Sequence, residues 1–156
     1  MFPSRIWNEL YASTMDRAML ELLELNEKTK AYGLILTPDD VKNVMLSRQQ
    51  ALENYGRVEL GIDVSKALIE EFASSPYIDN DNYTSVLDEL HDIFYYLKNE
   101  TEDRISDFQL VAFIRDCFDH DCYGSIELLR SKLETYAENF RREIPLDGRL
   151  FEGEDD

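Results

Sequence analysis

The sequence has little proline, glycine and cysteine: four, six and two residues in a chain of 156. Proline and glycine interrupt regular structure, so their scarcity lets most of the chain run through it. No apolar run is longer than about five residues, against the roughly 18 that a transmembrane helix needs. The first 17 residues also lack an uninterrupted apolar segment. We therefore expect no signal peptide and no membrane partner, and two reduced cysteines in a cytoplasmic protein.

Positive charge is scarce as well. Lys and Arg number 16 against 33 Asp and Glu, which gives a formal net charge of −17. A chain of this sign repels phosphate backbones and anionic lipids, which argues against direct binding of nucleic acid or membrane surfaces. The balance suits a basic protein partner, a cation or simple solubility.

Apolar residues recur at spacings of three and four along most of the chain, which is the period of an amphipathic helix. The sequence therefore predicts an all-α fold, a single compact domain of about six helices over residues 1–142. Apolar and polar residues alternate briefly near residues 57–61, which is compatible with one short extended segment there. Residues 143–156 lose the pattern and read as an acidic C-terminal tail.

Several helix ends are marked by the residues that satisfy free backbone groups. Thr37 is suited to cap a helix that ends at Gly56, and Ser125 to cap the last helix. Ser106 and Gln109 have the spacing of a reciprocal capping box. The expected apolar faces of the last two helices are Phe108, Val111, Ile114 and Phe118, and Leu128, Leu129, Leu133, Tyr136 and Phe140.

The stretch "FDHDCYGSIELLR", residues 118–130, has the outline of an EF-hand calcium loop. Counted from Asp119, Asp121 and Gly124 stand at positions 3 and 6, as such a loop requires. Tyr123 at position 5 and Arg130 at position 12 cannot supply the carboxylate oxygens needed there. The stretch is better explained as a bend, with side-chain turns at Asp119 and Asp121 and a positive φ at Gly124.

The same stretch holds side chains that bind transition metals or carry redox chemistry. Cys117 and His120 are three residues apart, as are Asp88 and His91, so each pair shares a helix face. With only two histidines in the chain, the weak metal candidates are His91, Cys117, His120 and Cys122, and we assign neither a metal nor a cofactor. We expect Cys117 in the core and Cys122 half-buried in the turn.

The region between Ala67 and Leu97 contains no Lys or Arg but seven acidic residues. Either it is a solvated face of two helices, or it is a docking surface for a basic partner. His91 shares a helix face with carboxylates there, so we expect it to keep its proton to higher pH. With the aromatic N-terminal helix, the candidate partner-binding residues are Trp7, Asp79, Asp81, Asp88, Asp92, Tyr95 and Tyr96.

The sequence shows no glycine-rich phosphate loop, no Gly-x-Ser-x-Gly and no histidine beside a credible nucleophile, so we assign no catalytic residue. We expect a non-enzymatic protein–protein interaction module, an adaptor or regulatory subunit, with an acidic, tyrosine-bearing helical surface. An acidic DNA-mimic inhibitor of a nucleic-acid enzyme and a metal-binding or redox protein are the alternatives. A homo-oligomer also stays open.

Five phrases of the sequence occur together in one known family: "NEKTKAYGLILTPDD", "YGRVEL", "SSPYIDNDNY", "LHDIFYYLKNE" and "CYGSIELL". Over residues 24–140 the chain resembles a family of small uncharacterised bacterial proteins, found mainly in Gram-positive anaerobes and grouped as a domain of unknown function. The resemblance implies a bacterial, cytoplasmic protein. It implies no activity, cofactor or catalytic residue.

Overall fold

The computed structural model describes the backbone of residues 4–142 and the side chains of residues 14–142. The chain is all-α, with six helices of ten residues or more in the described part and no strand there. The elements are α1 (Ser4–Glu24), α2 (Asn26–Thr29), η1 (Lys30–Tyr32), α3 (Pro38–Asn54), α4 (Asp63–Phe72), α5 (Tyr83–Glu100), α6 (Asp107–Asp116), η2 (Cys117–Asp121) and α7 (Ile126–Arg141). The predicted fold class is confirmed.

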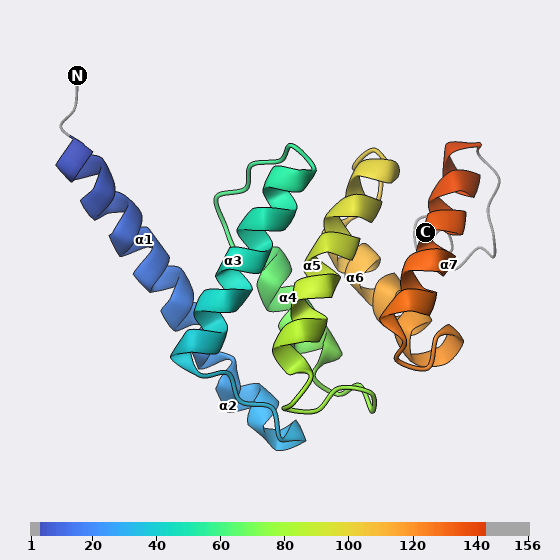
Figure 1. Cartoon of the computed structure of the whole chain (residues 1–156), viewed down its shortest axis with the longest axis horizontal. Coiled ribbons are helices and arrows are strands. Elements are labelled where there is room, and N and C mark those ends of the chain that lie inside the picture. Colours follow the sequence, from blue (N-terminus) through green and yellow to red (C-terminus); the bar gives the residue numbers. More distant parts are fainter. Residues whose placement is uncertain (1–3, 143–156) are drawn as a thin grey trace.

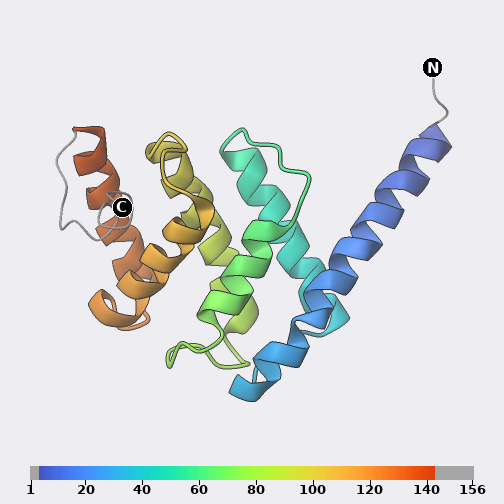
Figure 2. The same cartoon turned by 180° about the vertical axis from the view of Figure 1, so that it is seen from behind.

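The helices alternate between two layers. In Figure 1, α3, α5 and α7 follow one another across the front, α4 and α6 lie behind them, and α1 lies at the outer side of α3. Figure 2, seen from the opposite side, shows α4 and α6 next to each other. Since α5 contacts α3 and α7 on its two sides, residues distant in sequence meet along the front layer.

The buried apolar side chains form one cluster between the two layers. Leu22, Leu68, Leu87, Phe94 and Phe118 are among its fully buried members and come from both layers. At about 2 kcal/mol for each fully buried side chain, this cluster supplies most of the driving force for folding.

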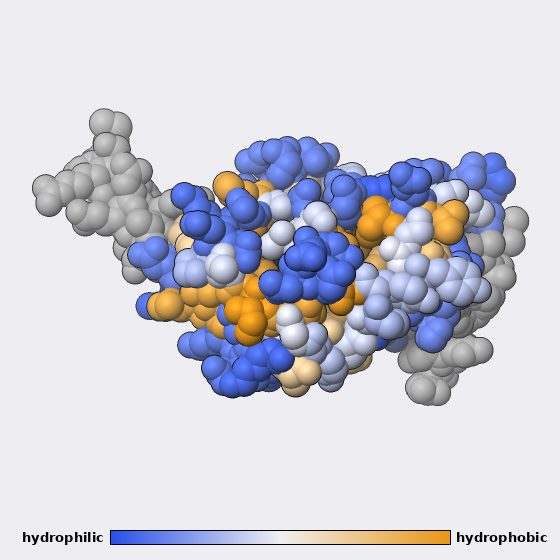
Figure 3. All heavy atoms as spheres, turned by 60° about the horizontal axis from the view of Figure 1, so that its bottom comes forward, coloured by the Kyte–Doolittle hydropathy of each residue, from blue (hydrophilic) through white to orange (hydrophobic). Residues whose placement is uncertain are grey.

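The N-terminal half of α1 stands away from the other helices in Figures 1 and 2. On the face shown in Figure 3, hydrophobic atoms form a band near α1, while most of the remaining surface is hydrophilic. Within α1, Leu20 is exposed, and Met19 and Leu23 are half-buried. The helix therefore leaves part of its apolar surface uncovered. In the described residues, no helix combines the length and apolarity needed to cross a membrane.

Helix caps follow the sequence signals, with one correction. The Thr37 side chain accepts a hydrogen bond from the backbone of Asp40, whose carboxylate accepts one in return from the Thr37 backbone. Ser106 caps α6 by accepting from the Gln109 N–H. The reciprocal half predicted for this box is wrong, because the Gln109 side chain instead accepts from the Ser106 hydroxyl.

Two expected core positions are also wrong. Phe108 and Leu128 lie on the predicted apolar faces, but they are 75% and 54% exposed. Both stand in the first turn of their helix, at the ends of α6 and α7. The helical spacing of apolar residues can extend to the first turn of a helix, but a side chain there is buried only if a neighbouring element covers it.

Residues 117–125 form a bend, as predicted, but the contacts that hold it are less local. The helix continues past Phe118 as a π-helical turn to Asp121, after which Gly124 has φ +78°. Asp119 accepts hydrogen bonds from Ser75 Oγ at 2.7 Å and from Arg115 Nε at 2.6 Å. The carboxylate of Asp119 therefore ties this bend to the loop between α4 and α5, where a local side-chain turn was expected.

Residues 57–61 form a loop that a buried arginine holds in place. Arg48 of α3 donates hydrogen bonds to the carbonyls of Glu59 and Gly61 at 2.7 and 2.6 Å. The Glu59 carboxylate also accepts a hydrogen bond from the Tyr95 hydroxyl. Although this loop connects α3 to α4 in the chain, its hydrogen bonds also link α3 to α5 at the upper end of the front layer (Figure 1).

Candidate functional site

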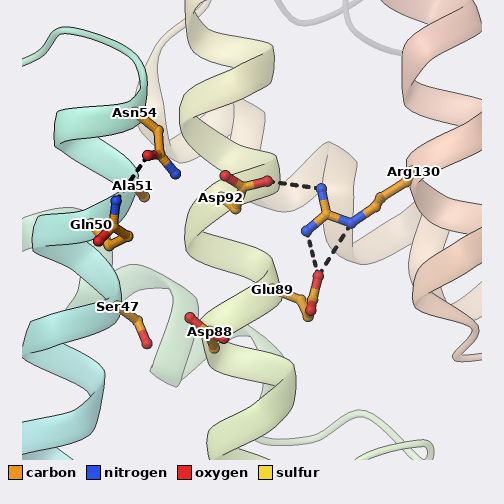
Figure 4. A pocket seen from close by; sticks show the side chains of 8 residues that line it. All are labelled: Ser47, Gln50, Ala51, Asn54, Asp88, Glu89, Asp92 and Arg130. Carbon is orange, nitrogen blue, oxygen red and sulfur yellow. Dashed lines mark hydrogen bonds and ion pairs between the residues drawn. The ribbon is translucent and has the colours of Figure 1, made fainter.

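A polar cleft opens where α3, α5 and α7 meet in the front layer. It encloses about 200 Å³. Figure 4 shows α3 on one side, α5 in the middle and Arg130 reaching across from α7. The lining residues, which define the α3–α5–α7 cleft, are Ser47, Gln50, Ala51, Asn54, Asp88, Glu89, Asp92 and Arg130.

The cleft follows from helical spacing on each helix. On α5, Asp88, Asp92 and Tyr96 are four residues apart and therefore lie on one face. On α3, Gln50 and Asn54 have the same spacing, and their side-chain amides are hydrogen bonded at 2.9 Å. The two polar stripes face each other because α3 packs alongside α5.

Arg130 forms ion pairs with two of the three carboxylates. Its guanidinium donates to Asp92 at 2.8 Å and binds Glu89 through two nitrogens (Figure 4). Asp88 is exposed and has no ion pair within the described residues. The cleft therefore keeps an uncompensated carboxylate beside the amide groups of α3.

An aromatic hollow adjoins the cleft on the other side of Arg130. It encloses about 110 Å³ and is lined by Tyr55, Ile93, Tyr96, Arg130, Leu133 and Glu134. The rings of Tyr55 and Tyr96 have centroids 6.4 Å apart. The Tyr55 hydroxyl donates to Asp92 at 3.1 Å. Burial, followed by the charge of Asp92, raises the pKa of Tyr55 to about 12, so the phenol stays protonated at neutral pH.

The predicted interface residues do not all reach this surface. Asp88, Asp92 and Tyr96 do, as lining residues of the cleft or the hollow. Asp79 and Asp81 lie in the loop before α5, where Asp79 accepts the Asp81 N–H at 2.9 Å. Asp79 therefore has a role in forming the loop. Trp7 stands in α1, but its side chain is outside the described residues.

Tyr95 is not a surface residue, and this expectation is wrong. Its side chain is fully buried, with the ring 5.0 Å from that of Phe94 in an edge-to-face arrangement. Its hydroxyl donates to Glu59 at 2.6 Å. Burial, together with the hydrogen bond and charge of Glu59, raises the pKa of Tyr95 well above its usual value. This residue secures the 57–61 loop to α5.

His91 contradicts the prediction of a raised pKa. The ring is fully buried, and its Nδ1 donates to the Leu87 carbonyl at 2.7 Å, since a carbonyl only accepts. Nε2 is therefore unprotonated and accepts from Ser65 Oγ at 2.7 Å. Burial lowers the pKa of His91 to about 4, outweighing the opposing effect of Asp88.

The Ser65–His91 contact has the spacing of a nucleophile and its base, and no pattern in the sequence indicates it. Three features oppose a catalytic role. Both residues are fully buried. The second ring nitrogen binds a carbonyl, where serine hydrolases have a carboxylate. Neither residue lines the cleft or the hollow. The pair is a satisfied polar contact between α4 and α5.

The other metal and redox candidates lie apart from His91. Cys117 is buried as expected, but Cys122 is only 2% exposed and not half-buried. Burial, followed by the charge of Asp121, raises the pKa of the Cys122 thiol, which disfavours the reactive thiolate. His120 is exposed, with Nε2 3.8 Å from Asp116. In the described part of the chain, no three His, Cys, Asp or Glu residues form a group that could hold a metal ion.

The helices from α2 to α7, with the cleft between α3, α5 and α7, lie within the part of the chain that matches a known family model. A family model described as a family of unknown function, DUF6323, matches residues 21–145. The chain belongs to this family. The DUF6323 region contains every residue of the cleft and the hollow, and the match confirms the expected membership in a domain family of unknown function. Neither the curated proteins nor the solved structures give a match to the chain.

Proposed function

We propose that this DUF6323 protein is a non-enzymatic interaction module, an adaptor or regulatory subunit, that holds a basic segment of a protein partner in the α3–α5–α7 cleft. The observation that carries the proposal is the state of the Asp88 carboxylate in the cleft. This carboxylate is exposed, has no ion pair in the described residues, and lines a hollowed polar surface.

The chemistry of the cleft suits a lysine or arginine side chain. Asp88 supplies a charged acceptor, and the amide oxygens of Gln50 and Asn54 supply neutral ones. The adjoining hollow offers the rings of Tyr55 and Tyr96 to an apolar neighbour of that cation. Tyrosine rings are enriched at interfaces because they bury a large area at small entropic cost. The net charge of −17 would also raise the rate of encounter with a basic partner.

The proposal is tested by affinity purification of the tagged protein from a nuclease-treated lysate of its source organism, eluted with increasing salt. Asp88→Arg reverses the charge in the cleft without breaking an ion pair among the described residues. Glu24→Arg is the matched control, because Glu24 is exposed on α1 and the change in net charge is the same.

A protein partner retained by the wild type and by Glu24→Arg, but lost from Asp88→Arg, would support the cleft. Equal retention by all three proteins would contradict it. A partner that handles DNA or RNA and elutes at low salt would favour the alternative of an acidic DNA mimic, because binding through many exposed charges is readily screened by salt.

A further inference from the structure

A second groove lies in the back layer, between α4 and α6. It encloses about 410 Å³, about twice the volume of the α3–α5–α7 cleft. The two helices are neighbours in Figure 2 and are in contact with each other. The lining residues, which define the α4–α6 groove, are Asp63, Lys66, Ala67, Glu70, Glu71, Phe108 and Val111.

The wall of this groove includes an exposed aromatic side chain. Phe108 is 75% exposed, although an aromatic ring of this size is normally placed in the core or at an interface. It stands in the first turn of α6, where the Lys98–Asp107 ion pair at 2.7 Å holds the start of the helix against α5. Ala67 and Val111 complete the apolar part of the groove. The ring is therefore presented by a fixed helix end.

The charged rim of the groove is acidic. Asp63, Glu70 and Glu71 line it from α4 at helical spacing. The lining contains three carboxylates and one lysine, Lys66, so its net charge is negative. Lys66 lies 4.0 Å from Glu21 of α1, in a weak surface pair. Lys28 lies 3.5 Å from Glu70, with both side chains largely in solvent, so this pair is weak. The groove thus combines an apolar interior with a negative rim.

We infer that the α4–α6 groove binds an amphipathic basic helix of a partner protein. Its apolar side chains would contact the exposed ring of Phe108 and the half-buried Ala67, and its Lys or Arg side chains would face the acidic rim. The ten residues of α4 span about 15 Å, which accommodates about three turns of such a helix. This surface lies in the opposite layer from the cleft and does not depend on it.

Charge argues against two other occupants. A second copy of the chain, bound through the same face, would bring two acidic rims together at a net charge of −17 per chain. The sequence of residues 143–156 contains six acidic residues and one arginine, so the acidic rim would repel it as well. A basic partner is the occupant that the rim favours.

The test is a nitrogen-15 NMR titration of the protein with a synthetic helical peptide built from Leu and Lys, with Leu on one face. A scrambled peptide of the same composition, which cannot form that face, is the control. We expect amide shifts to cluster on α4 and α6 and to be weak with the scrambled peptide. Phe108→Ser should weaken binding about tenfold, whereas Leu128→Ser, which removes an exposed apolar side chain from α7, should leave it unchanged.

Three results would overturn the inference. Shifts spread evenly over the acidic surface would show attraction by net charge alone. Shifts confined to α3, α5 and α7 would place the peptide in the cleft, which leaves the proposed function standing and removes the groove. Self-association in sedimentation experiments that Phe108→Ser abolishes would identify a second copy as the occupant.

Discussion

Replacing His91 with glutamine should remove an acid-dependent loss of stability that the burial of this histidine creates. In the folded chain the pKa of His91 is lowered from 6.5 to about 4, first by burial and then by the charge of Arg48. The carbonyl of Leu87 and the charge of Asp88 oppose this shift without reversing it. The unfolded chain therefore binds one more proton than the folded chain between these two values.

The sign and size of the effect follow from linkage. The contribution of neutral His91 to stability is fully present above pH 6.5 and is lost as the pH falls toward about 4. Between neutral pH and pH 5 the loss is about 2 kcal/mol, and below pH 4 it reaches about 3 kcal/mol. A loss of this size is a large part of the 5–15 kcal/mol, roughly, that stabilises an ordinary domain.

The assay is urea unfolding, followed by circular dichroism, at neutral pH and at about pH 5. The proteins are the wild type, His91→Gln and His120→Gln. Glutamine can both donate and accept at position 91 but does not titrate. His120 is exposed, so His120→Gln should behave as the wild type.

We expect the wild type to lose about 2 kcal/mol more than His91→Gln between the two pH values. Equal losses would refute the reasoning. Should the variant fail to fold, the ring resonances of wild-type His91 give the same test, since the ring should be mostly unprotonated at pH 5. Titration of this ring near pH 6.5 would equally contradict the account.

Three further predictions concern stability, and urea unfolding measures each of them. Tyr95→Ala should lower the free energy of unfolding by about 3–5 kcal/mol, because the ring is fully buried; a loss under about 1 kcal/mol would contradict that burial. Gly124→Ala should cost clearly more than Gly33→Ala, which serves as its control. Both glycines have φ near +77°, but only at Gly124 would a Cβ clash with the Tyr77 side chain, so equal costs would argue against that contact. Thr37→Ala should cost about 1 kcal/mol by removing the cap of α3; no change would mean that water replaces the cap.

Local signals predicted the helices well. The caps at Thr37 and Ser125 depend on residues within a few positions of one another, so the local sequence contains the information needed to predict them. The burial of His91 and Tyr95 depends on neighbours from both layers, because α5 contacts α3, α4, α6 and α7. An estimate of burial from one apolar helix face is therefore too low for α5, because other helices cover it on several sides.

A signal for this burial was present in the sequence. Ser85, Asp88, Asp92 and Asn99 follow helical spacing and mark the narrow stripe of α5 that meets solvent or the cleft. His91 and Tyr95 lie outside that stripe. No comparable sequence pattern predicts that α3 and α7 lie beside α5, because contacts between helices that are distant in sequence depend on how the whole chain packs. Tyr55, Gln50 and Asn54 were missed as parts of the site for this reason, and Arg130 was considered only as part of a calcium loop.

The most direct measurement of the central claim is site-specific photo-crosslinking from within the cleft. A photoreactive phenylalanine analogue would replace Gln50, which lines the cleft on α3, and in a second protein Glu24, which is exposed on α1. Both proteins would be irradiated in cells of the source organism and their adducts identified by mass spectrometry. The account predicts one protein partner crosslinked from position 50 through a lysine- or arginine-bearing peptide and absent from position 24. The same adducts at equal yield from both positions, or none from position 50, would contradict it.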